Sequence, residues 1–468
     1  MLWTGIDRLG TQLIQFVIGI LIARVLLPSD YGLIGMLAIF MGVAQTFLDS
    51  GFANALIQKK DRNTLDYSTV FYFSIVIGVI LYLILYVAAP WIADFYSQPI
   101  LTQITRVYML TLVINGLAIV HTAKMTIDLD FRSQAVISIV SIICSGGLGI
   151  WMAYSGYGVW ALVWQGICLA SVRMILSWIF CRWLPLLRFS LQSFRKLFSF
   201  GSKLLGSSLI NRVSSNLSTI IIGKVFHSAE LGFFTRANQF CVLPTTTITN
   251  IVLKVNFPIL SQLQDDDARL LEAYKTLLRT PVWLLYPILF GIAALARPLI
   301  LTLLGENWLG SASLIPILAF GSLWDPLTHI NLNLLYVKGR SDLVLKLELI
   351  KKPIAFVMLL SAIPFGIIGM CISIALYSFI AFCFNCHYTG KMLGYGFGKQ
   401  VREILPILGY CVVMLAGVVP FNFLNIHPAA QLFLGIAAGM IIYISVSVAN
   451  KDTSYLGVRK IIKEKFHI

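Results

Sequence analysis

Two stretches of this chain read almost alike although they lie far apart. The first is ARVLLPSDYGL, residues 23–33, and the second is GKVFHSAELGF, residues 223–233. In each, an apolar run ends in a short polar turn, and an acid and a glycine follow at the same offset: Asp30 and Gly32, then Glu230 and Gly232. The same turn at a constant offset indicates the same structural element twice, so we expect an internal repeat.

Composition places this repeat in a membrane. Of the 468 residues, 58% are hydrophobic and only 12% are charged, about half the charged fraction of soluble domains. We therefore expect an all-α polytopic membrane protein, because an open strand leaves backbone groups unpaired in lipid. The net charge is +15, but the basic residues fill short gaps between apolar runs, which argues against a nucleic-acid partner.

Long apolar runs recur along the whole chain. A membrane-spanning helix needs about 20 mostly apolar residues, and about fourteen runs qualify. The predicted spans are 9–27, 32–57, 68–90, 100–123, 135–154, 157–181, 197–226, 231–260, 277–302, 311–337, 349–369, 370–390, 403–422 and 429–449.

Lysine and arginine predict how these spans cross the membrane. The gaps after even-numbered spans are basic, as at Lys59, Lys60 and Arg62, whereas the gaps after odd-numbered spans contain neither lysine nor arginine. Cytoplasmic loops are enriched in these residues, so a multi-pass protein with both termini in the cytoplasm is expected. Short outer loops leave no room for a catalytic domain. We expect a protein that is not an enzyme and has no catalytic residues, cofactor or metal site.

The cysteines support the same expectation. All eight lie in or beside apolar runs, and the CxxC of Cys383 and Cys386 has no second pair at zinc spacing. They are interpreted as small apolar residues in helices.

The direction of the repeat predicts the architecture. An even number of spans separates the two matching turns, so both copies enter the membrane in the same direction. Such a parallel repeat favours two lobes of about six helices around a central cavity, with an appended helix pair, as in alternating-access transporters. The predicted parts are an N-lobe at 1–190, a C-lobe at 191–400, the last two helices at 401–450 and a basic cytoplasmic tail at 451–468.

Polar residues inside the apolar runs are the candidate site, because ionisable groups are expensive in lipid. Arg212 lies midway along the seventh span and shares a helical face with Ser215 and Asn216. Arginine pairs with phosphate and amides match sugar hydroxyls, so such a cavity suits an anionic, hydroxyl-rich cargo. The alternatives are a structural bond from Arg212 to a neighbouring helix and an Arg236 that reaches the interface. The predicted substrate-binding residues are Arg212, Lys254, Arg236, Asn216, Asn250, Gln12 and Gln15.

A second group predicts ion coupling. Asp325 precedes Pro326, which should break or kink its helix, and His329 lies one turn further on. A carboxylate and a histidine on one face can carry a coupling proton or cation. Asp49, on the inner half of the second span, is the third candidate. The alternative for Asp325 is an ion pair with a buried arginine.

The residues around the repeat resemble a known family. ARVLLPSDYGLIGMLAIFMGVAQTFLDSGFANALIQKKDR (23–62), AELGFFTRANQF (229–240) and NFPILSQLQDDDARLLEAY (256–274) are similar to the corresponding parts of Wzx-type polysaccharide, O-antigen and colanic-acid flippases. These flippases form the polysaccharide transport family of the multidrug/oligosaccharidyl-lipid/polysaccharide exporter superfamily.

The resemblance implies a function. It implies that undecaprenyl-pyrophosphate-linked oligosaccharide moves from the cytoplasmic to the periplasmic leaflet of the bacterial inner membrane by alternating access. Arg212, Lys254 and Arg236 are then expected to contact the pyrophosphate or acidic sugars. The implied partners are the lipid-linked oligosaccharide, membrane lipid, a glycan polymerase and chain-length proteins, and a monomer is expected.

Other functions predict other sequences. A multidrug or cation antiporter of the same superfamily is expected to have about twelve spans and an acidic pair in its cavity. A membrane glycan polymerase or ligase is expected to have a large outer loop rich in arginine and histidine. The sequence does not exclude a third alternative, a scaffold that binds lipid-linked glycan without moving it.

Overall fold

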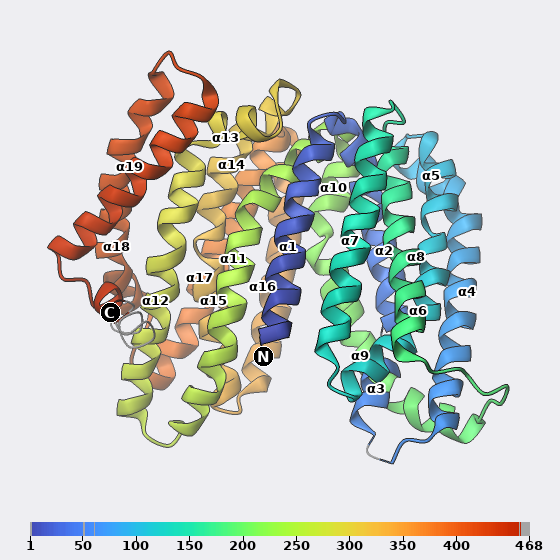
Figure 1. Ribbon diagram of the computed structural model, residues 1–468. Helices are drawn as coiled ribbons and strands as arrows, with labels where there is room; N and C mark the ends of the chain where they lie inside the picture. Colours follow the sequence, from blue (N-terminus) through green and yellow to red (C-terminus); the bar gives the residue numbers. More distant parts are fainter. Residues whose placement is uncertain (1, 50–51, 60, 458, 460–468) are drawn as a thin grey trace. The chain divides into compact units, whose positions relative to one another are not determined.

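The computed structural model describes residues 2–49, 52–59, 61–457 and 459, and the described part consists of helices and short connections (Figure 1). The chain divides into two compact units, Met1–Gly232 and Phe233–Ile468. Most of the predicted basic tail, 451–468, lies outside the described residues.

The described residues of the first unit form ten helices and the beginning of an eleventh. They are α1 (Leu2–Ala23), α2 (Pro28–Asp49), α3 (Phe52–Gln58), α4 (Thr64–Tyr96), α5 (Ile100–Tyr108), α6 (Leu110–Ile127), α7 (Phe131–Tyr154), α8 (Trp160–Cys181), α9 (Leu191–Ser215), α10 (Leu217–Val225) and the first turn of α11 (Ser228–Gln262).

Apolar side chains hold the helices of this unit together. Helix α7 packs against α1 and α8, and α6 packs against α4 and α8. Ile22 and Ala161 are fully buried in the cluster between α1, α7 and α8. Helix α9 packs on α2, α3 and α4. The seventh predicted span therefore contacts helices of the first unit.

The second unit contains the rest of α11 and the remaining helices. They are α12 (Asp267–Ala294), α13 (Ala296–Leu303), the 3₁₀ turn η1 (Glu306–Trp308), α14 (Leu309–Ser322), α15 (Asp325–Val337), α16 (Ser341–Ala362), η2 (Ile363–Phe365), α17 (Gly366–Leu393), α18 (Phe397–Val418), η3 (Val419–Phe423) and α19 (Pro428–Ala449).

The last two helices are fastened to the second unit by ion pairs. Arg279 of α12 donates from Nη1 to Glu403 Oε1 of α18 at 2.7 Å and from Nη2 to Asp452 Oδ2, just after α19, at 2.6 Å. The Asp452 side chain is fully buried. An unpaired carboxylate there is costly, so Arg279 fixes α18 and α19 to α12.

The observed helices coincide with the apolar runs of the sequence. Each predicted span overlaps one or two α-helices, as 197–226 does with α9 and α10, and 349–369 also includes the 3₁₀ turn η2 between α16 and α17. Among the described residues, ten helical stretches are long and apolar enough to cross a membrane. The fold class is therefore confirmed as an all-helical, multi-pass membrane protein.

The two similar turns have the same local structure. Asp30 accepts a hydrogen bond from the Leu27 N–H at 3.0 Å, and Glu230 accepts one from the His227 N–H at 3.2 Å. Each acid thus reaches back from the third residue of a helix, α2 or α11, to satisfy a backbone donor that precedes it. The repeat in the sequence is a repeated helix start.

The two helix starts also touch, and the glycines allow it. A β-carbon on Gly32 would collide with the Ser228 carbonyl and lie 2.5 Å from its carbon. A β-carbon on Gly232 would collide with the Pro28 carbonyl and lie 2.7 Å from its carbon. The contact is reciprocal, backbone against backbone, and lies within the first unit. We call it the glycine contact.

Candidate functional site

The seventh span is interrupted beside Arg212. Helix α9 ends at Ser215 and α10 begins at Leu217, with Asn216 between them. The Asn216 amide donates to the Arg212 carbonyl at 2.8 Å, and the Ser215 hydroxyl donates to the same carbonyl at 3.0 Å. A carbonyl freed by the break is thereby satisfied. Asn216, predicted to bind substrate, has its amide engaged at this break.

The Arg212 side chain crosses α2 at a glycine. A β-carbon on Gly42 would lie 3.0 Å from Arg212 Nε and 3.2 Å from its Cδ. The guanidinium is therefore laid against the surface of α2, while the residue as a whole stays exposed. A larger residue than glycine at position 42 has to push the arginine away.

Polar side chains on four helices continue from this point. Asn115 of α6 donates to Gln45 of α2 at 3.1 Å, and the Gln45 amide donates to Asp49 Oδ1 at 2.8 Å. The guanidinium charges of Arg212 on α9 and Arg173 on α8 both act on the Asp49 carboxylate. We call Gln45, Asp49, Asn115, Arg173 and Arg212 the first-unit polar cluster. It holds two cations and one anion.

Three members of this cluster were not among the predicted site residues. Arg173 interrupts the apolar run LASVRMILSW, residues 169–178. A charge inside a predicted span indicates a functional residue, so Arg173 could have been predicted from the sequence. Gln45 and Asn115 could not be predicted, because their hydrogen bond joins two helices that lie far apart in the sequence. Gln12 and Gln15 lie on α1, and neither side chain forms a hydrogen bond with the described residues.

In the second unit, α11 presents a polar face. Asn250 and Lys254 are one turn apart and exposed, and neither side chain has a hydrogen-bond or ion-pair partner in the part of the chain that the structure describes. Arg236, on the same helix, is buried: it donates to Gln239 at 2.6 Å and its guanidinium lies 5.9 Å from the centre of the Trp308 ring. Arg236 is thus engaged inside the unit, whereas Asn250 and Lys254 are accessible.

The predicted helix break at Pro326 is confirmed. Helix α14 ends at Ser322 and α15 begins at Asp325, with Pro326 at its second position. Asp325 Oδ1 accepts a hydrogen bond from the Ser378 hydroxyl of α17 at 2.7 Å, and the nearby His329 is exposed. No lysine or arginine among the described residues forms an ion pair with Asp325.

A groove of about 480 Å³ lies between α12, α18 and α19. Its lining includes Trp283, Gly291, Leu295, Val418 and Tyr443. The lining is almost entirely apolar. An aliphatic chain suits such a surface, and a charged group does not.

Comparison with known proteins agrees with this architecture. The model of the family described as "Polysaccharide biosynthesis protein" matches residues 21–313. The teichuronic acid biosynthesis protein TuaB of Bacillus subtilis is 29% identical over 343 residues, which are 73% of this chain and 71% of TuaB. The succinoglycan biosynthesis transport protein ExoT of Rhizobium meliloti is 25% identical over 337 residues, which are 72% of this chain and 68% of ExoT.

A solved structure shows the same fold. The lipid II flippase MurJ in an inward closed conformation superposes with a TM-score of 0.78 over 97% of this chain and 99% of MurJ, at 14% identity. The family match covers more than half of the chain. This chain therefore belongs to the polysaccharide biosynthesis protein family.

Proposed function

We propose that this protein is a flippase for lipid-linked oligosaccharide, with undecaprenyl-pyrophosphate-linked glycan as its substrate. The observation that carries the proposal is the first-unit polar cluster, in which the charges of two arginines act on one carboxylate on otherwise apolar helices. Family membership, the names of TuaB and ExoT and the fold shared with MurJ support it. The protein acts as a transporter and not as an enzyme.

The cluster has the chemistry to hold a pyrophosphate. Arg173 and Arg212 together exceed the charge of Asp49, so the site has a net positive charge that an anion neutralises. Guanidinium groups donate two parallel hydrogen bonds to phosphate oxygens. The amides of Gln45 and Asn115, with Gln12 and Gln15 on α1, offer donors and acceptors for sugar hydroxyls.

The second unit contributes a separate contact. Asn250 and Lys254 lie free on one face of α11, and they are proposed to bind the glycan or a phosphate as the substrate crosses. Arg236 and Asn216 are assigned to structure, since their side chains already bond Gln239 and the Arg212 carbonyl.

The apolar groove on the second unit suits the lipid tail. The polar cluster offers a polyprenyl chain no apolar surface to pack against. The groove between α12, α18 and α19 is lined by apolar side chains and can bury part of such a chain. The head group crosses at polar residues and the tail stays in apolar surroundings. That division avoids the cost of several kcal/mol for each polar group transferred to lipid without a partner.

The transport cycle is proposed to be alternating access. For this cycle we propose about fourteen crossings, in two lobes of about six helices at 1–190 and 191–400 and an appended pair at 401–450. The protein is proposed to lie in a bacterial inner membrane with both termini in the cytoplasm. A glycan polymerase and chain-length proteins are proposed partners, and the protein is proposed to act as a monomer.

Asp325 and His329 are proposed to couple transport to an ion. Asp325 accepts a hydrogen bond from the Ser378 hydroxyl and interacts electrostatically with the nearby His329. No described lysine or arginine forms an ion pair with it. This arrangement favours the coupling role over a locking ion pair. Asp49, in contrast, accepts a hydrogen bond from Gln45 and is acted on by the charges of Arg212 and Arg173, so its proposed role is to hold the first-unit polar cluster together.

Vesicles that contain the purified protein test the function directly. A fluorescent undecaprenyl-pyrophosphate oligosaccharide placed in one leaflet should reach the other, and deletion of the gene should leave lipid-linked oligosaccharide on the cytoplasmic leaflet. Losing one charge-assisted hydrogen bond costs about 1.5–3 kcal/mol, so Arg173→Ala and Arg212→Ala should each weaken apparent affinity roughly 10- to 100-fold.

Arg269→Ala is the matched control, because Arg269 is exposed at the start of α12 and pairs with Asp266. If the vesicles move drugs or simple cations instead of the lipid-linked sugar, the antiporter alternative is correct. If all three arginine variants transport equally, the site assignment fails although the function stands.

A further inference from the structure

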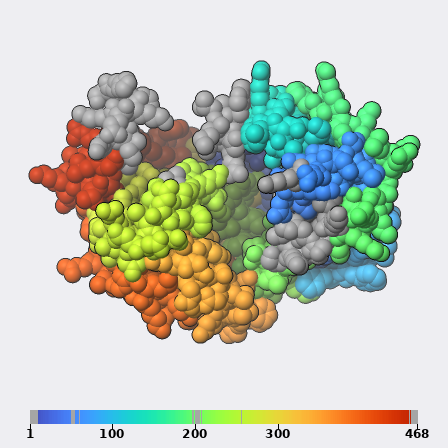
Figure 2. Space-filling model, turned by 90° about the horizontal axis from the view of Figure 1, so that it is seen from below, coloured from blue at the N-terminus to red at the C-terminus, as the bar shows by residue number. Residues whose placement is uncertain are grey.

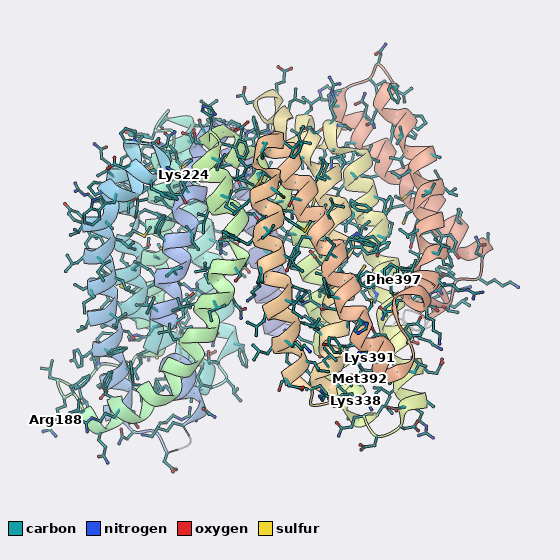
Figure 3. The ribbon with its side chains drawn as sticks, turned by 180° about the vertical axis from the view of Figure 1, so that it is seen from behind. Arg188, Lys224, Lys338, Lys391, Met392 and Phe397 are labelled. Atoms are coloured by element: carbon teal, nitrogen blue, oxygen red, sulfur yellow. The ribbon has the colours of Figure 1, made fainter. Side chains whose placement is uncertain are left out.

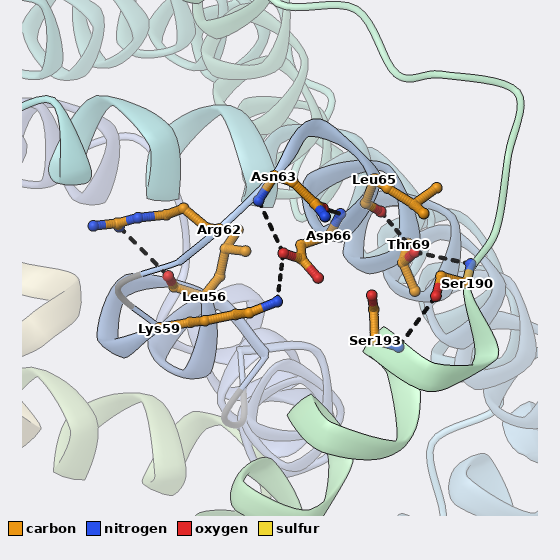
Figure 4. Close-up of polar contacts among 9 residues, drawn as sticks. All are labelled: Leu56, Lys59, Arg62, Asn63, Leu65, Asp66, Thr69, Ser190 and Ser193. Atoms are coloured by element: carbon orange, nitrogen blue, oxygen red, sulfur yellow. Dashed lines mark hydrogen bonds and ion pairs between the residues drawn. The ribbon is translucent and has the colours of Figure 1, made fainter.

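The segment that joins α8 to α9 has a fixed inner side. It leaves α8 at Arg182, whose backbone is left-handed at φ 46°, and runs without regular secondary structure to Ser190, with a bend at Leu187. The Leu186 N–H donates to Ser68 Oγ at 2.8 Å. The Ser190 N–H donates to Thr69 Oγ1 at 3.1 Å, as Figure 4 shows. Both hydroxyls belong to the first turns of α4. The segment is therefore tied down and not loose.

An aromatic side chain strengthens this attachment. Trp183 packs against Tyr67, Phe71 and His121, with ring centres 6.0, 5.9 and 5.3 Å away. His121 Nε2 also lies 3.2 Å from the Trp183 carbonyl oxygen. Trp183 therefore faces the unit, and the residues on the other side of the backbone face away from it.

The outer side of the segment is apolar. Leu184 is 72% exposed and Leu187 is 93% exposed, and Phe189 and Leu191 are exposed by more than half. Phe189 packs against the Phe194 ring, with ring centres 6.0 Å apart, whereas Leu184 and Leu187 stay on the outer side of a backbone that is bonded to α4. They follow directly after α8, an apolar helix long enough to span the membrane, so they lie where acyl chains meet head groups.

Arginines stand among these leucines. Arg182, Arg188 and Arg195 are exposed, and none of their side chains has an ion-pair or hydrogen-bond partner among the described residues. Figure 3 shows Arg188 at the outer edge of the unit, and the space-filling view of this end shows the green surface of this part of the chain along the rim of the same unit (Figure 2).

We propose that residues 182–195 form a binding site for anionic phospholipid head groups. The three guanidiniums donate to phosphodiester oxygens, while Leu184 and Leu187 insert into the acyl boundary of the same leaflet. A nucleic acid offers no partner for the leucines. The adjoining membrane span places a lipid surface within reach of both residue types, and this favours lipid over a protein partner.

Native mass spectrometry of the purified full chain in neutral detergent tests the site. Phosphatidylglycerol and phosphatidylcholine are titrated into the wild type and into the triple variant R182Q/R188Q/R195Q. Each basic residue near an anionic surface contributes about 1 kcal/mol, or roughly fivefold in affinity. The triple variant should bind phosphatidylglycerol about a hundredfold more weakly and phosphatidylcholine equally.

A second triple variant, R269Q/K275Q/K338Q, controls for net charge. It removes the same number of positive charges, but each of these residues pairs with an acid: Asp266, Glu272 and Asp267. It should retain phosphatidylglycerol. L184S/L187S should weaken the binding of both lipids, because it removes apolar contacts with their acyl chains. Its unfolding temperature in lipid-free detergent should match that of the wild type.

Three outcomes would overturn the proposal. One is an equal loss of phosphatidylglycerol in the two triple variants, which would mean that only net charge matters. Another is equal binding of both lipids by the wild type. The third is retention of a co-purified protein that is released by R182Q/R188Q/R195Q while lipid binding is unchanged. None of these readouts depends on transport.

Discussion

The glycine contact makes the sharpest prediction about this fold. In Gly32→Ala, the new methyl group meets the carbonyl of Ser228, and in Gly232→Ala it meets the carbonyl of Pro28. The colliding atoms belong to backbone in both cases, so no side chain can rotate to make room. Either substitution must push the start of α2 away from the start of α11.

The size of the displacement follows from the geometry. In Gly32→Ala the added β-carbon would lie 2.5 Å from the Ser228 carbonyl carbon, whereas ordinary contact begins at 3.4 Å, so the helix starts must separate by at least about 0.9 Å. Overpacking of this kind typically costs about 1–3 kcal/mol. Each single variant is expected to lose that much stability in the first unit.

The losses of stability caused by Gly32→Ala and Gly232→Ala should not be additive. Once Gly32→Ala has separated the helix starts, Gly232→Ala finds part of the space already made. Residues that share one contact show coupling energies of about 0.5–3 kcal/mol in double-mutant cycles. We therefore expect the double variant to lose clearly less stability than the sum of the two single losses.

Thermal unfolding in detergent and hydrogen–deuterium exchange measure these effects. Exchange should rise in peptides that cover the starts of α2 and α11 and stay unchanged in α7. Gly147→Ala, within α7, is the matched control because a β-carbon there meets nothing within 4 Å; it should be neutral or stabilising by up to about 1 kcal/mol. Additive losses, or Gly32→Ala behaving like Gly147→Ala, would refute the reasoning.

Three further substitutions test the second unit. Arg279→Ala leaves Glu403 and the buried Asp452 unpaired and should cost about 3–5 kcal/mol, measured by thermal unfolding, with faster exchange in α18 and α19; an unchanged midpoint would contradict this. Asn331→Leu removes two hydrogen bonds from the buried Gln400 amide and should cost about 1–3 kcal/mol by the same measurement. Gly291→Leu narrows the apolar groove at a place with nothing within 4 Å, so stability should hold while vesicle transport of a long polyprenyl substrate falls and that of a short-chain analogue does not.

Apolar runs were enough to predict where the helices lie, because lipid leaves a helix little choice of structure. The break at Pro326 was also predictable, since proline removes a donor and clashes with the preceding turn. The break at Asn216 was not, because no proline or glycine marks it. It depends on an amide that satisfies the Arg212 carbonyl, which only the folded chain shows.

The repeat predicted equivalent positions but not their contact. Asp30 and Glu230 were recognisable as counterparts from their offset, and they do make the same hydrogen bond. That Gly32 and Gly232 also pack against each other's helix could not follow from the sequence, because equivalence of two segments says nothing about their distance. The hydrogen bond between Gln45 and Asn115 was hidden for the same reason.

The charge balance of the first-unit polar cluster links fold to function. A lone arginine within apolar helices is expensive, and Asp49 offsets that cost for Arg173 or for Arg212 but not fully for both. A neutral residue in place of Asp49 would leave both guanidiniums without a counter-charge. A neutral residue in place of either arginine would leave one cation and one anion, a pair with no net charge that no longer attracts an anion. The sequence instead has a cluster with excess positive charge, and in the proposed function the pyrophosphate of the substrate compensates that charge.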